Sequence, residues 1–213
     1  MLEVEYDDQQ RAFSDAVRLL CDRVRPEWTE QRFPERTWAE LAAIGLFELV
    51  EPSGTAELAA VLTELGAQGC PGPLWDAVLA IGALPPESTR SLVDGSQVAV
   101  VGTGDRWPWP DRAGLAVELG PDGAWLARLP PHTPRRRVLT GEQWAAGQAT
   151  RLDPIAQHRL TDALDRADLA AAAYLTGAAE RLVADAARYV AARQQFGQPL
   201  GDRQGVAFPL AEA

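Results

Sequence analysis

Residues 161–194 form the longest uninterrupted helical pattern of the sequence, and they constrain the fold more than any other feature. The stretch contains no proline and one glycine, Gly177. At 1.5 Å per residue it predicts a helix of about nine turns, roughly 50 Å long. Several positions follow one another in steps of three, four or seven residues, a spacing typical of a long helix in an antiparallel bundle. These positions are Leu175, Leu182, Ala186, Tyr189 and Arg193.

The residues that follow are expected to end this helix and to begin another. Phe196 and Gly197 end the pattern, Pro199 prevents its resumption, and a new helical stretch starts near Asp202. A helix that begins without a partner leaves apolar surface uncovered. We therefore expect that either more chain or another subunit covers this region.

The first part of the chain contains four shorter helical patterns, with apolar side chains at i, i+3, i+4 and i+7. Pro34 is expected to open the second helix, Gly66 to close the third, and Pro73 to precede the fourth. Pro85 and Pro86 then break the pattern. This part of the chain is predicted to be all-helical.

The middle of the chain changes to short strand patterns. Residues 98–101 are an apolar run typical of a buried strand. Residues 115–119 and 124–129 lie on either side of a turn at 121–123, which predicts a β-hairpin. The Trp-Pro-Trp-Pro sequence at 107–110 is expected to be a loop. The middle is therefore predicted to be a small β region.

The composition excludes several classes of function. Twenty basic and thirty acidic residues give a net charge of −10, which repels phosphate backbones and anionic lipids, so we expect no nucleic-acid and no membrane partner. All basic residues are arginines, so lysine Schiff-base chemistry and a P-loop lysine are excluded. No apolar run approaches a membrane span of about 18 residues. We expect a cytoplasmic protein in which Cys21 and Cys70 are buried thiols.

Three weaker motifs do not change this prediction. Gly102 and Gly104 follow a predicted strand, but the third glycine of a dinucleotide-binding fingerprint is missing, so a strand-to-loop turn is expected. His132 and His158 have no further ligand at metal-binding spacing, so no metal site is expected. Arg135–Arg137 is a cationic spot, either a solvated strand end or a phosphate contact.

The most specific motif begins at the end of the long helix. It resembles R-x-x-F-G-x-P-[IL]-x-x-x-Q-x-V-x-x-x-L-A-[DE], the signature of flavin-dependent acyl-CoA dehydrogenases. The matching residues are Arg193, Phe196, Gly197, Pro199, Leu200, Gln204, Val206, Leu210, Ala211 and Glu212. Two other segments also resemble this family: residues 38–46 match W-x-x-L-A-x-x-G-L, and Leu65 and Gly66 followed by Pro-Gly-Pro-Leu at 71–74 resemble the turn between its third and fourth helices.

The resemblance implies a fold that is mainly α with a small β domain. The family has an N-terminal helical domain, here residues 1–94, and a central β domain, here a reduced one over 95–155. A C-terminal four-helix bundle follows, of which residues 156–213 are the start. The resemblance also implies an oligomer, either a homo-oligomer or a heteromeric dehydrogenase with a partner subunit.

The resemblance further implies that the chain binds FAD at a subunit interface. Arg193 corresponds to the arginine that contacts the FAD diphosphate of the neighbouring subunit. Phe196 and Gln204 help to hold the same cofactor, Gln195 lies in the same turn, and Gly197 lets the chain leave the helix. A guanidinium at the end of a rigid helix is well suited to bidentate binding of a diphosphate.

The chemistry implied is α,β-desaturation of an acyl-CoA thioester, in which a carboxylate removes the α proton and a hydride passes to FAD. The catalytic residue is not identified in this chain. The family's common catalytic glutamate lies well beyond the R-x-x-F-G motif. A minority of members place the base early in the long helix, where Ala167 stands here with Asp165 and Asp168 close by. The family's T-E-P-x-x-G-S-D-like loop is absent from the middle of the sequence.

Three hypotheses about function follow. The chain is an acyl-CoA dehydrogenase, or part of one, whose remaining bundle is lost or carried elsewhere. Alternatively, it is a non-catalytic subunit of a heteromeric dehydrogenase that supplies the FAD diphosphate half-site. A flavin-free helical interaction module is the third possibility.

Overall fold

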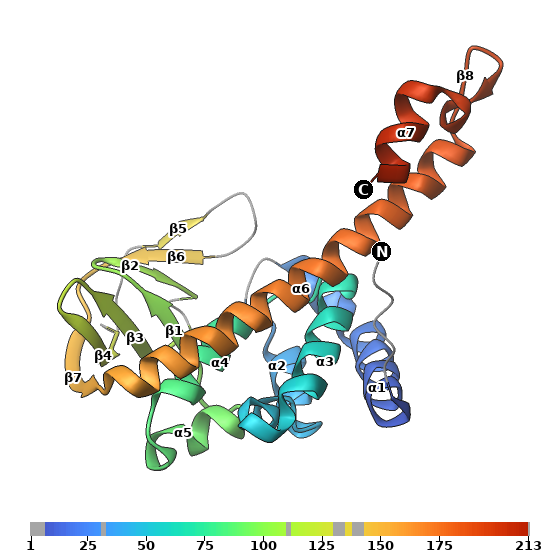
Figure 1. The fold of residues 1–213 in the computed structure, drawn as a ribbon. Helices are drawn as coiled ribbons and strands as arrows, with labels where there is room; N and C mark the ends of the chain where they lie inside the picture. The colour runs from blue at the N-terminus through green and yellow to red at the C-terminus, as the bar shows by residue number, and fades with distance from the viewer. Residues whose placement is uncertain (1–6, 31–32, 110–111, 130–134, 138–142, 213) are drawn as a thin grey trace.

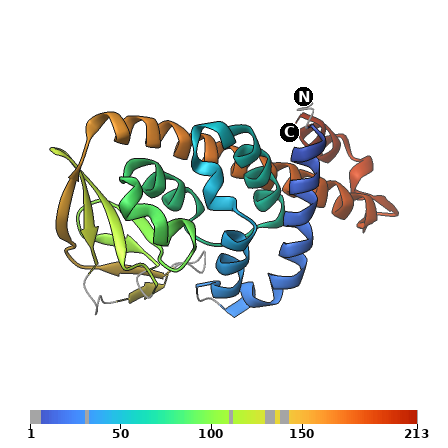
Figure 2. The same cartoon turned by 90° about the horizontal axis from the view of Figure 1, so that it is seen from below.

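The fold is taken from a computed structural model, which describes residues 7–30, 33–109, 112–129, 135–137 and 143–212. It is mainly helical with a small β region, so the predicted fold class is confirmed (Figure 1). One long helix organises the molecule. The β region lies beside its start, the shorter helices lie along its middle, and its C-terminal end projects beyond both (Figures 1 and 2).

The N-terminal part consists of α-helices joined by short 3-10 segments. The first helix begins with a capping box, because the Asp7 carboxylate accepts a hydrogen bond from the backbone N–H of Gln10, and the Gln10 side chain accepts one from the backbone N–H of Asp7. The segments are α1 (Asp8–Val24), η1 (Arg25–Glu30), α2 (Glu35–Ala43), η2 (Leu46–Val50), η3 (Pro52–Gly54), α3 (Thr55–Gln68), α4 (Leu74–Ala83) and α5 (Pro86–Val93).

One expectation for this part was wrong, and one helix was not predicted. Gly66 does not close the third helix, because α3 continues to Gln68 and ends at Gly69, whose φ of +67° is the usual left-handed helix end. Pro85 and Pro86 do break the pattern, because α4 ends at Ala83, but a further helix, α5, begins directly after the break. Pro86 occupies the first turn of α5, where its missing N–H costs no hydrogen bond.

Gly66 has a packing role instead, at the crossing of α3 and the long helix α6 (Gln157–Ala192). A Cβ added at Gly66 would overlap the carbonyl oxygen of Tyr174, and one added at Gly177 would overlap the carbonyl oxygen of Thr63. The two helices therefore approach each other backbone to backbone, which only glycine permits at these two positions.

The β region contains two small sheets. The first has the strand order β1-β3-β4-β7 and the second β2-β6-β5. The predicted hairpin is confirmed: β3 and β4 pair antiparallel from Leu115 with Arg128 to Gly120 with Gly123. The predicted strand at 98–101 is also confirmed, as β1, which pairs parallel with β3. The strands are β1 (Ala99–Gly102), β2 (Arg106–Pro108), β3 (Leu115–Gly120), β4 (Gly123–Arg128), β5 (Arg135–Arg137), β6 (Gln143–Ala146) and β7 (Thr150–Ile155).

The expected loop at 107–110 is partly a strand. Trp107 and Pro108 belong to β2, which pairs with β6. The indole of Trp107 is fully buried, and its N–H donates to the carbonyl oxygen of Gly147 at 2.8 Å. Burial of this ring holds the segment in the sheet in spite of the neighbouring prolines.

The long helix predicted over 161–194 is confirmed as α6, a single helix of 36 residues. A short antiparallel strand pair and a last helix follow it. These elements are β8 (Gln194–Gln195), β9 (Gln198–Pro199), η4 (Leu200–Asp202) and α7 (Gln204–Glu212).

The buried apolar residues form two clusters. The first lies mainly among the N-terminal helices, where it includes Trp38, Leu41 and Phe47, and extends into the β region at Val100 and Trp107. The second joins α4, the β sheet and the first turns of α6, with Leu79 and Leu160 among its members. This second cluster fixes α4, the sheet and α6 relative to one another, and these three elements frame the cavity described below.

Candidate functional site

The motif residues Arg193, Gln195, Phe196 and Gly197 gather in a tight hairpin at the C-terminal end of α6 (Figure 1). Strands β8 and β9 pair antiparallel, with Phe196 and Gly197 as the two turn residues. The backbone N–H of Leu200 donates to the carbonyl oxygen of Arg193 at 2.7 Å, which closes the base of the hairpin. We call this segment, residues 193–204, the C-terminal hairpin.

The turn of the C-terminal hairpin is conformationally unusual. Phe196 has a φ of +54° and Gly197 a φ of +82°, the pattern of a type I′ turn. A Cβ added at Gly197 would meet no atom within 4 Å, so the backbone conformation and not space calls for glycine. For phenylalanine the left-handed region costs about 1–3 kcal/mol, and yet the ring is 87% exposed. A strained turn that holds an aromatic ring in solvent is typical of a binding segment.

Arg203, which the sequence motif does not single out, packs against this ring. Its guanidinium carbon lies 4.6 Å from the centre of the Phe196 ring. Its Nε is buried and has no hydrogen-bond partner among the described residues. A buried donor without a partner, beside an arginine-containing turn, fits an anionic group such as a diphosphate. No sequence pattern indicates this contact, because it depends on how the hairpin folds back.

The remaining motif residues lie at the same end of the molecule. Arg193 follows the last residue of α6, its backbone N–H donates to Tyr189, and its side chain is exposed. Gln204 is the first residue of α7 and is also exposed. The structure thus brings the predicted cofactor residues onto consecutive elements at one tip, while the role of each stays a prediction.

A second candidate site is a cavity of about 440 Å³ that lies between α4, α6 and the first strands of the β region. We call it the α4–α6 cavity. Its walls are mostly apolar and include Trp75, Leu79, Trp109 and Leu164. Trp109 is a further residue with a left-handed backbone, at a φ of +49°. An apolar cavity of this size with a few polar groups is the usual form of a small-molecule site.

Three ionisable side chains line the α4–α6 cavity: Asp76, Arg106 and Asp168. Asp76 is only 6% exposed and lies in the first turn of α4, where the helix dipole stabilises a carboxylate. Asp168 lies on α6 and is exposed. Ala167, the position at which a base was considered, contributes a buried methyl group to the same wall, whereas Asp165 does not line the cavity.

The two candidate sites lie far apart along α6. Asp168 and Arg193 are 25 positions apart, which corresponds to about 38 Å of helix. This distance exceeds the length of an extended dinucleotide. One dinucleotide therefore cannot reach from the cavity of a chain to the C-terminal hairpin of the same chain.

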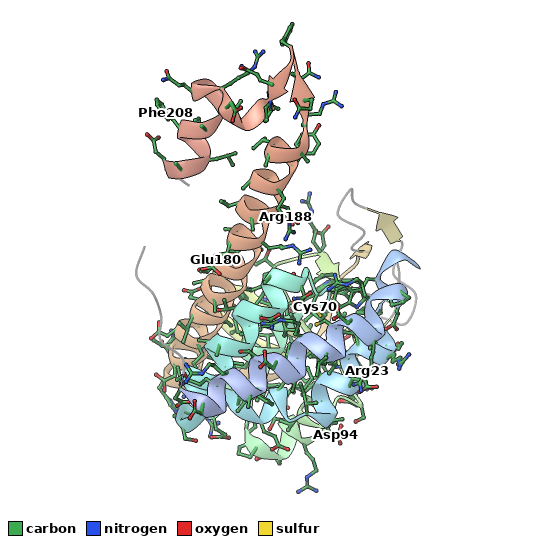
Figure 3. All side chains as sticks on the ribbon, turned by 90° about the vertical axis from the view of Figure 1, so that its right-hand side faces the viewer. Arg23, Cys70, Asp94, Glu180, Arg188 and Phe208 are labelled. Carbon is green, nitrogen blue, oxygen red and sulfur yellow. The ribbon has the colours of Figure 1, made fainter. Side chains whose placement is uncertain are left out.

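The C-terminal part of α6 exposes a row of large side chains. Leu175, Leu182 and Tyr189 recur every seven residues and are each more than 60% exposed. Phe208 on α7 adds another exposed ring near the same end (Figure 3). Single exposed apolar residues are ordinary, but a row at bundle spacing indicates a surface for helix packing.

The weaker motifs form no further site. Gly102 ends β1 and Gly104 lies in the turn before β2, so the glycine pair is a strand-to-strand turn. Over the described part of the chain, no group of three or more potential metal ligands comes together. His132 lies outside the described residues, and of Arg135–Arg137 the structure describes only the backbone of β5. No described helix is both long and apolar enough to span a membrane.

Comparison with known proteins gives consistent matches. Residues 158–213 match the C-terminal domain of acyl-CoA dehydrogenases. Acyl-CoA dehydrogenase FadE28 of Mycobacterium tuberculosis is 27% identical over 96% of this chain and 70% of that protein. The Tcur3481–Tcur3483 steroid ACAD G363A variant has a TM-score of 0.72 at 26% identity, over 96% of this chain and 73% of that one. The ChsE4–ChsE5 complex from Mycobacterium tuberculosis has a TM-score of 0.75 at 19% identity, over 98% and 73%.

The short helices, the small β region and the long helix after it are together the fold of the acyl-CoA dehydrogenases, a class of flavin-dependent oxidoreductases. The C-terminal domain match, the relative that spans most of the chain and the motif at Arg193 agree with this fold. The comparisons support an acyl-CoA dehydrogenase family member, with residues 158–213 matching the family's C-terminal domain and FadE28 similar over 96% of the chain.

Proposed function

We propose that this chain is a subunit of a flavin-dependent acyl-CoA dehydrogenase and contributes to two different active sites. Its α4–α6 cavity receives an acyl-CoA thioester, and its C-terminal hairpin holds the diphosphate of FAD bound to another chain. The observation that carries this proposal is the separation of the two sites by about 38 Å of continuous helix. A rigid helix of this length presents its tip to a neighbouring subunit and not to its own cavity.

In the C-terminal hairpin, Arg193 binds the diphosphate through its fork of N–H donors. Gln195, Phe196 and Gln204 contact the same cofactor from the hairpin and the start of α7, and Gly197 provides the turn between them. Bound FAD supplies the acceptance of a hydride, which the protein's own side chains cannot provide.

In the α4–α6 cavity, the apolar walls bind the acyl chain and the polar groups face the thioester. The reaction proposed is α,β-desaturation, in which a carboxylate of the cavity would take the α proton and the bound FAD would supply the hydride acceptor. Among the described residues that line the cavity, the carboxylates are Asp76 and Asp168. Asp76 is closed in at the first turn of α4, so Asp168 is the one with access to a substrate.

A second candidate function is that of a non-catalytic subunit in a heteromeric dehydrogenase. The observation that favours it is Ala167. Its methyl group lies on the cavity wall at the position where a minority of the family carries the base. The relatives support it too, because the ChsE4–ChsE5 and Tcur3481–Tcur3483 structures each pair two proteins. In this case the C-terminal hairpin still serves a flavin, whose ring and base belong to the partner.

The visible absorbance of bound flavin tests both functions. The chain is purified alone and after co-expression with candidate dehydrogenase subunits. Flavin colour in the isolated chain supports the first function, and colour in the co-complex alone supports the second. Absence of colour in both preparations contradicts both functions and leaves a flavin-free interaction module.

In the same experiment, Arg193→Ala tests whether the C-terminal hairpin binds the FAD diphosphate. Loss of a charged hydrogen-bonding group is worth about 1.5–3 kcal/mol, so flavin retention is expected to weaken about tenfold or more. Arg90→Ala on α5 removes an exposed arginine of the helical part and is expected to retain the flavin. Equal flavin content in the two variants would show that Arg193 does not bind the cofactor.

A further inference from the structure

We propose that Cys21 and Cys70 form a redox modification site, at which hydrogen peroxide joins the two thiols in a disulfide. This bond would tie helix α1 to the turn between α3 and α4. The two residues are the only cysteines of the sequence, and both are free, buried thiols in the structure. The proposed function uses neither of them, so this inference is independent of it.

The packing of α1 on α3 places Cys21 against the end of α3. Arg18 and Arg25 lie about two helical turns apart along α1, on either side of Cys21. Arg18 pairs with Glu64 of α3 at 2.9 Å. Arg25 donates to the carbonyl oxygen of Gln68 at 3.0 Å. Cys21 lies between these two contacts and is fully buried, so its side chain faces the last turn of α3.

Cys70 follows the end of α3, and its backbone is held at both ends. Its N–H donates to the carbonyl oxygen of Leu65 at 3.0 Å, and its carbonyl oxygen accepts a hydrogen bond from the hydroxyl of Tyr174 at 2.9 Å. The thiols of Cys70 and Cys21 are hydrogen-bonded to each other. Two sulfur atoms in this contact reach disulfide bonding distance through a small movement of their side chains.

The hydrogen bond makes the two thiols chemically unequal. It lowers the pKa of the Cys21 thiol against the effect of burial, and the charge of Arg25 acts in the same direction. The same hydrogen bond, together with burial, raises the pKa of the Cys70 thiol. Because the thiolate is the reactive form, Cys21 is the nucleophile and Cys70 the resolving thiol.

The reaction has two steps. The Cys21 thiolate attacks one oxygen of hydrogen peroxide, the O–O bond breaks, and Cys21 becomes a sulfenic acid while hydroxide leaves. The sulfur of Cys70 then attacks the sulfur of Cys21, the S–O bond breaks, and the oxygen leaves as water with the Cys70 proton. In sum, the two thiols lose two electrons and two protons, and the peroxide is reduced to two molecules of water.

Burial of the pair selects the oxidant. Cys21 is 0% and Cys70 1% exposed, so a bulky disulfide such as oxidised glutathione does not reach either sulfur in the folded chain. Hydrogen peroxide is little larger than water and enters through local fluctuations of the packing.

The test treats the purified full chain, reduced and then freed of reductant, with hydrogen peroxide. After denaturation, the thiol count is expected to fall from two to none, and the mass of a single chain to fall by two hydrogen atoms. The disulfide closes the segment 21–70, so the melting temperature should rise by several degrees and return after reduction.

Two variants test the order of the steps. Cys70→Ala removes the resolving thiol, so a sulfenic acid should accumulate at Cys21 and react with dimedone. Cys21→Ala is the matched control. It leaves only a buried thiol, which should take up several-fold less dimedone. Cys70→Ser replaces Cys70→Ala if circular dichroism shows that the latter does not fold.

Each other outcome contradicts the proposal. Two free thiols after prolonged treatment, a gain of oxygen in place of the loss of hydrogen, or a link between two chains would show that no internal disulfide forms. A disulfide that forms faster in urea, or that lowers the melting temperature, would show that the native packing does not bring the two sulfur atoms together. Equal dimedone labelling of the two variants would mean that Cys21 is not the nucleophile.

Discussion

Arg18 of α1 and Glu64 of α3 form a two-pronged ion pair that ties the first helix to the rest of the molecule. The Nε–Oε1 and Nη2–Oε2 distances are both 2.9 Å, and the Gln68 amide also donates to Glu64 at 2.8 Å. Burial acts to raise the pKa of Glu64, but the hydrogen bonds from Arg18 and Gln68 outweigh it. The pKa of this carboxyl group therefore lies below its ordinary range.

This ion pair predicts a pH-dependent stability. A carboxyl group whose pKa is lowered by folding stabilises the protein above its unfolded-state pKa, and this contribution is lost as the pH falls through the folded-state pKa. Because Arg18 is about half exposed, Glu64→Gln is expected to lower the free energy of unfolding by about 1 kcal/mol at neutral pH. The difference from the wild type should shrink as the pH falls below about 4.

Urea denaturation at several pH values measures this difference. Glu180→Gln in the middle of α6 is the control, since it removes an exposed carboxylate outside the α1–α3 contact. If Glu64→Gln lowers the free energy of unfolding equally at neutral and at strongly acidic pH, the ion pair with Arg18 is not the source of the stability.

At the scale of elements, the crossing of α3 and α6 depends on two glycines that face opposite backbones. An alanine at Gly177 would drive its Cβ into the carbonyl oxygen of Thr63, and a backbone atom cannot swing aside as a side chain can. Gly177→Ala is therefore expected to destabilise the protein by about 3 kcal/mol, in spite of the better helix propensity of alanine. Gly205→Ala is the matched control, because Gly205 is also helical and a Cβ there meets no atom within 4 Å.

Thermal unfolding of the two variants separates close packing from propensity. Gly205→Ala should leave the melting temperature unchanged or raise it slightly, and Gly177→Ala should lower it clearly. A Gly177→Ala variant as stable as the wild type would mean that α3 and α6 do not cross at this position.

The elements also show what can be predicted from sequence. The extent of α6 follows from the absence of proline over residues 161–194, and the β3–β4 hairpin follows from its turn. Gly66 was misassigned because a glycine needed for close helix packing looks like a glycine that ends a helix. Helix α5 was missed because Pro86 starts a helix as readily as it ends one.

At the scale of the whole molecule, the sequence carries less information about the site. The motif residues at 193–204 could be singled out because they are contiguous in the sequence, but the β8–β9 strand pair that they form was not predicted. The α4–α6 cavity could not be predicted, because its walls come from three elements that only the tertiary fold brings together. The stacking of Arg203 on Phe196 was missed for the same reason, since it depends on the left-handed turn and not on spacing.

The rest of the molecule covers only one part of α6. The N-terminal helices and the β region cover the first part of α6, while its C-terminal part projects away from them (Figure 3). Leu182 and Tyr189 on this part are exposed, as is Phe196 of the hairpin. An exposed row of apolar side chains and an arginine-rich tip on one helix favour contact with another chain. These features support the proposal that the flavin is shared between chains.

Native mass spectrometry of the flavin-containing preparation tests this claim most directly, because it reports the number of chains and the bound cofactor in the same particle. If the flavin is shared, FAD is found only in species with at least two polypeptide chains, and Arg193→Ala assemblies keep their chains but lose the FAD mass. A single chain that carries FAD under the same conditions would contradict it.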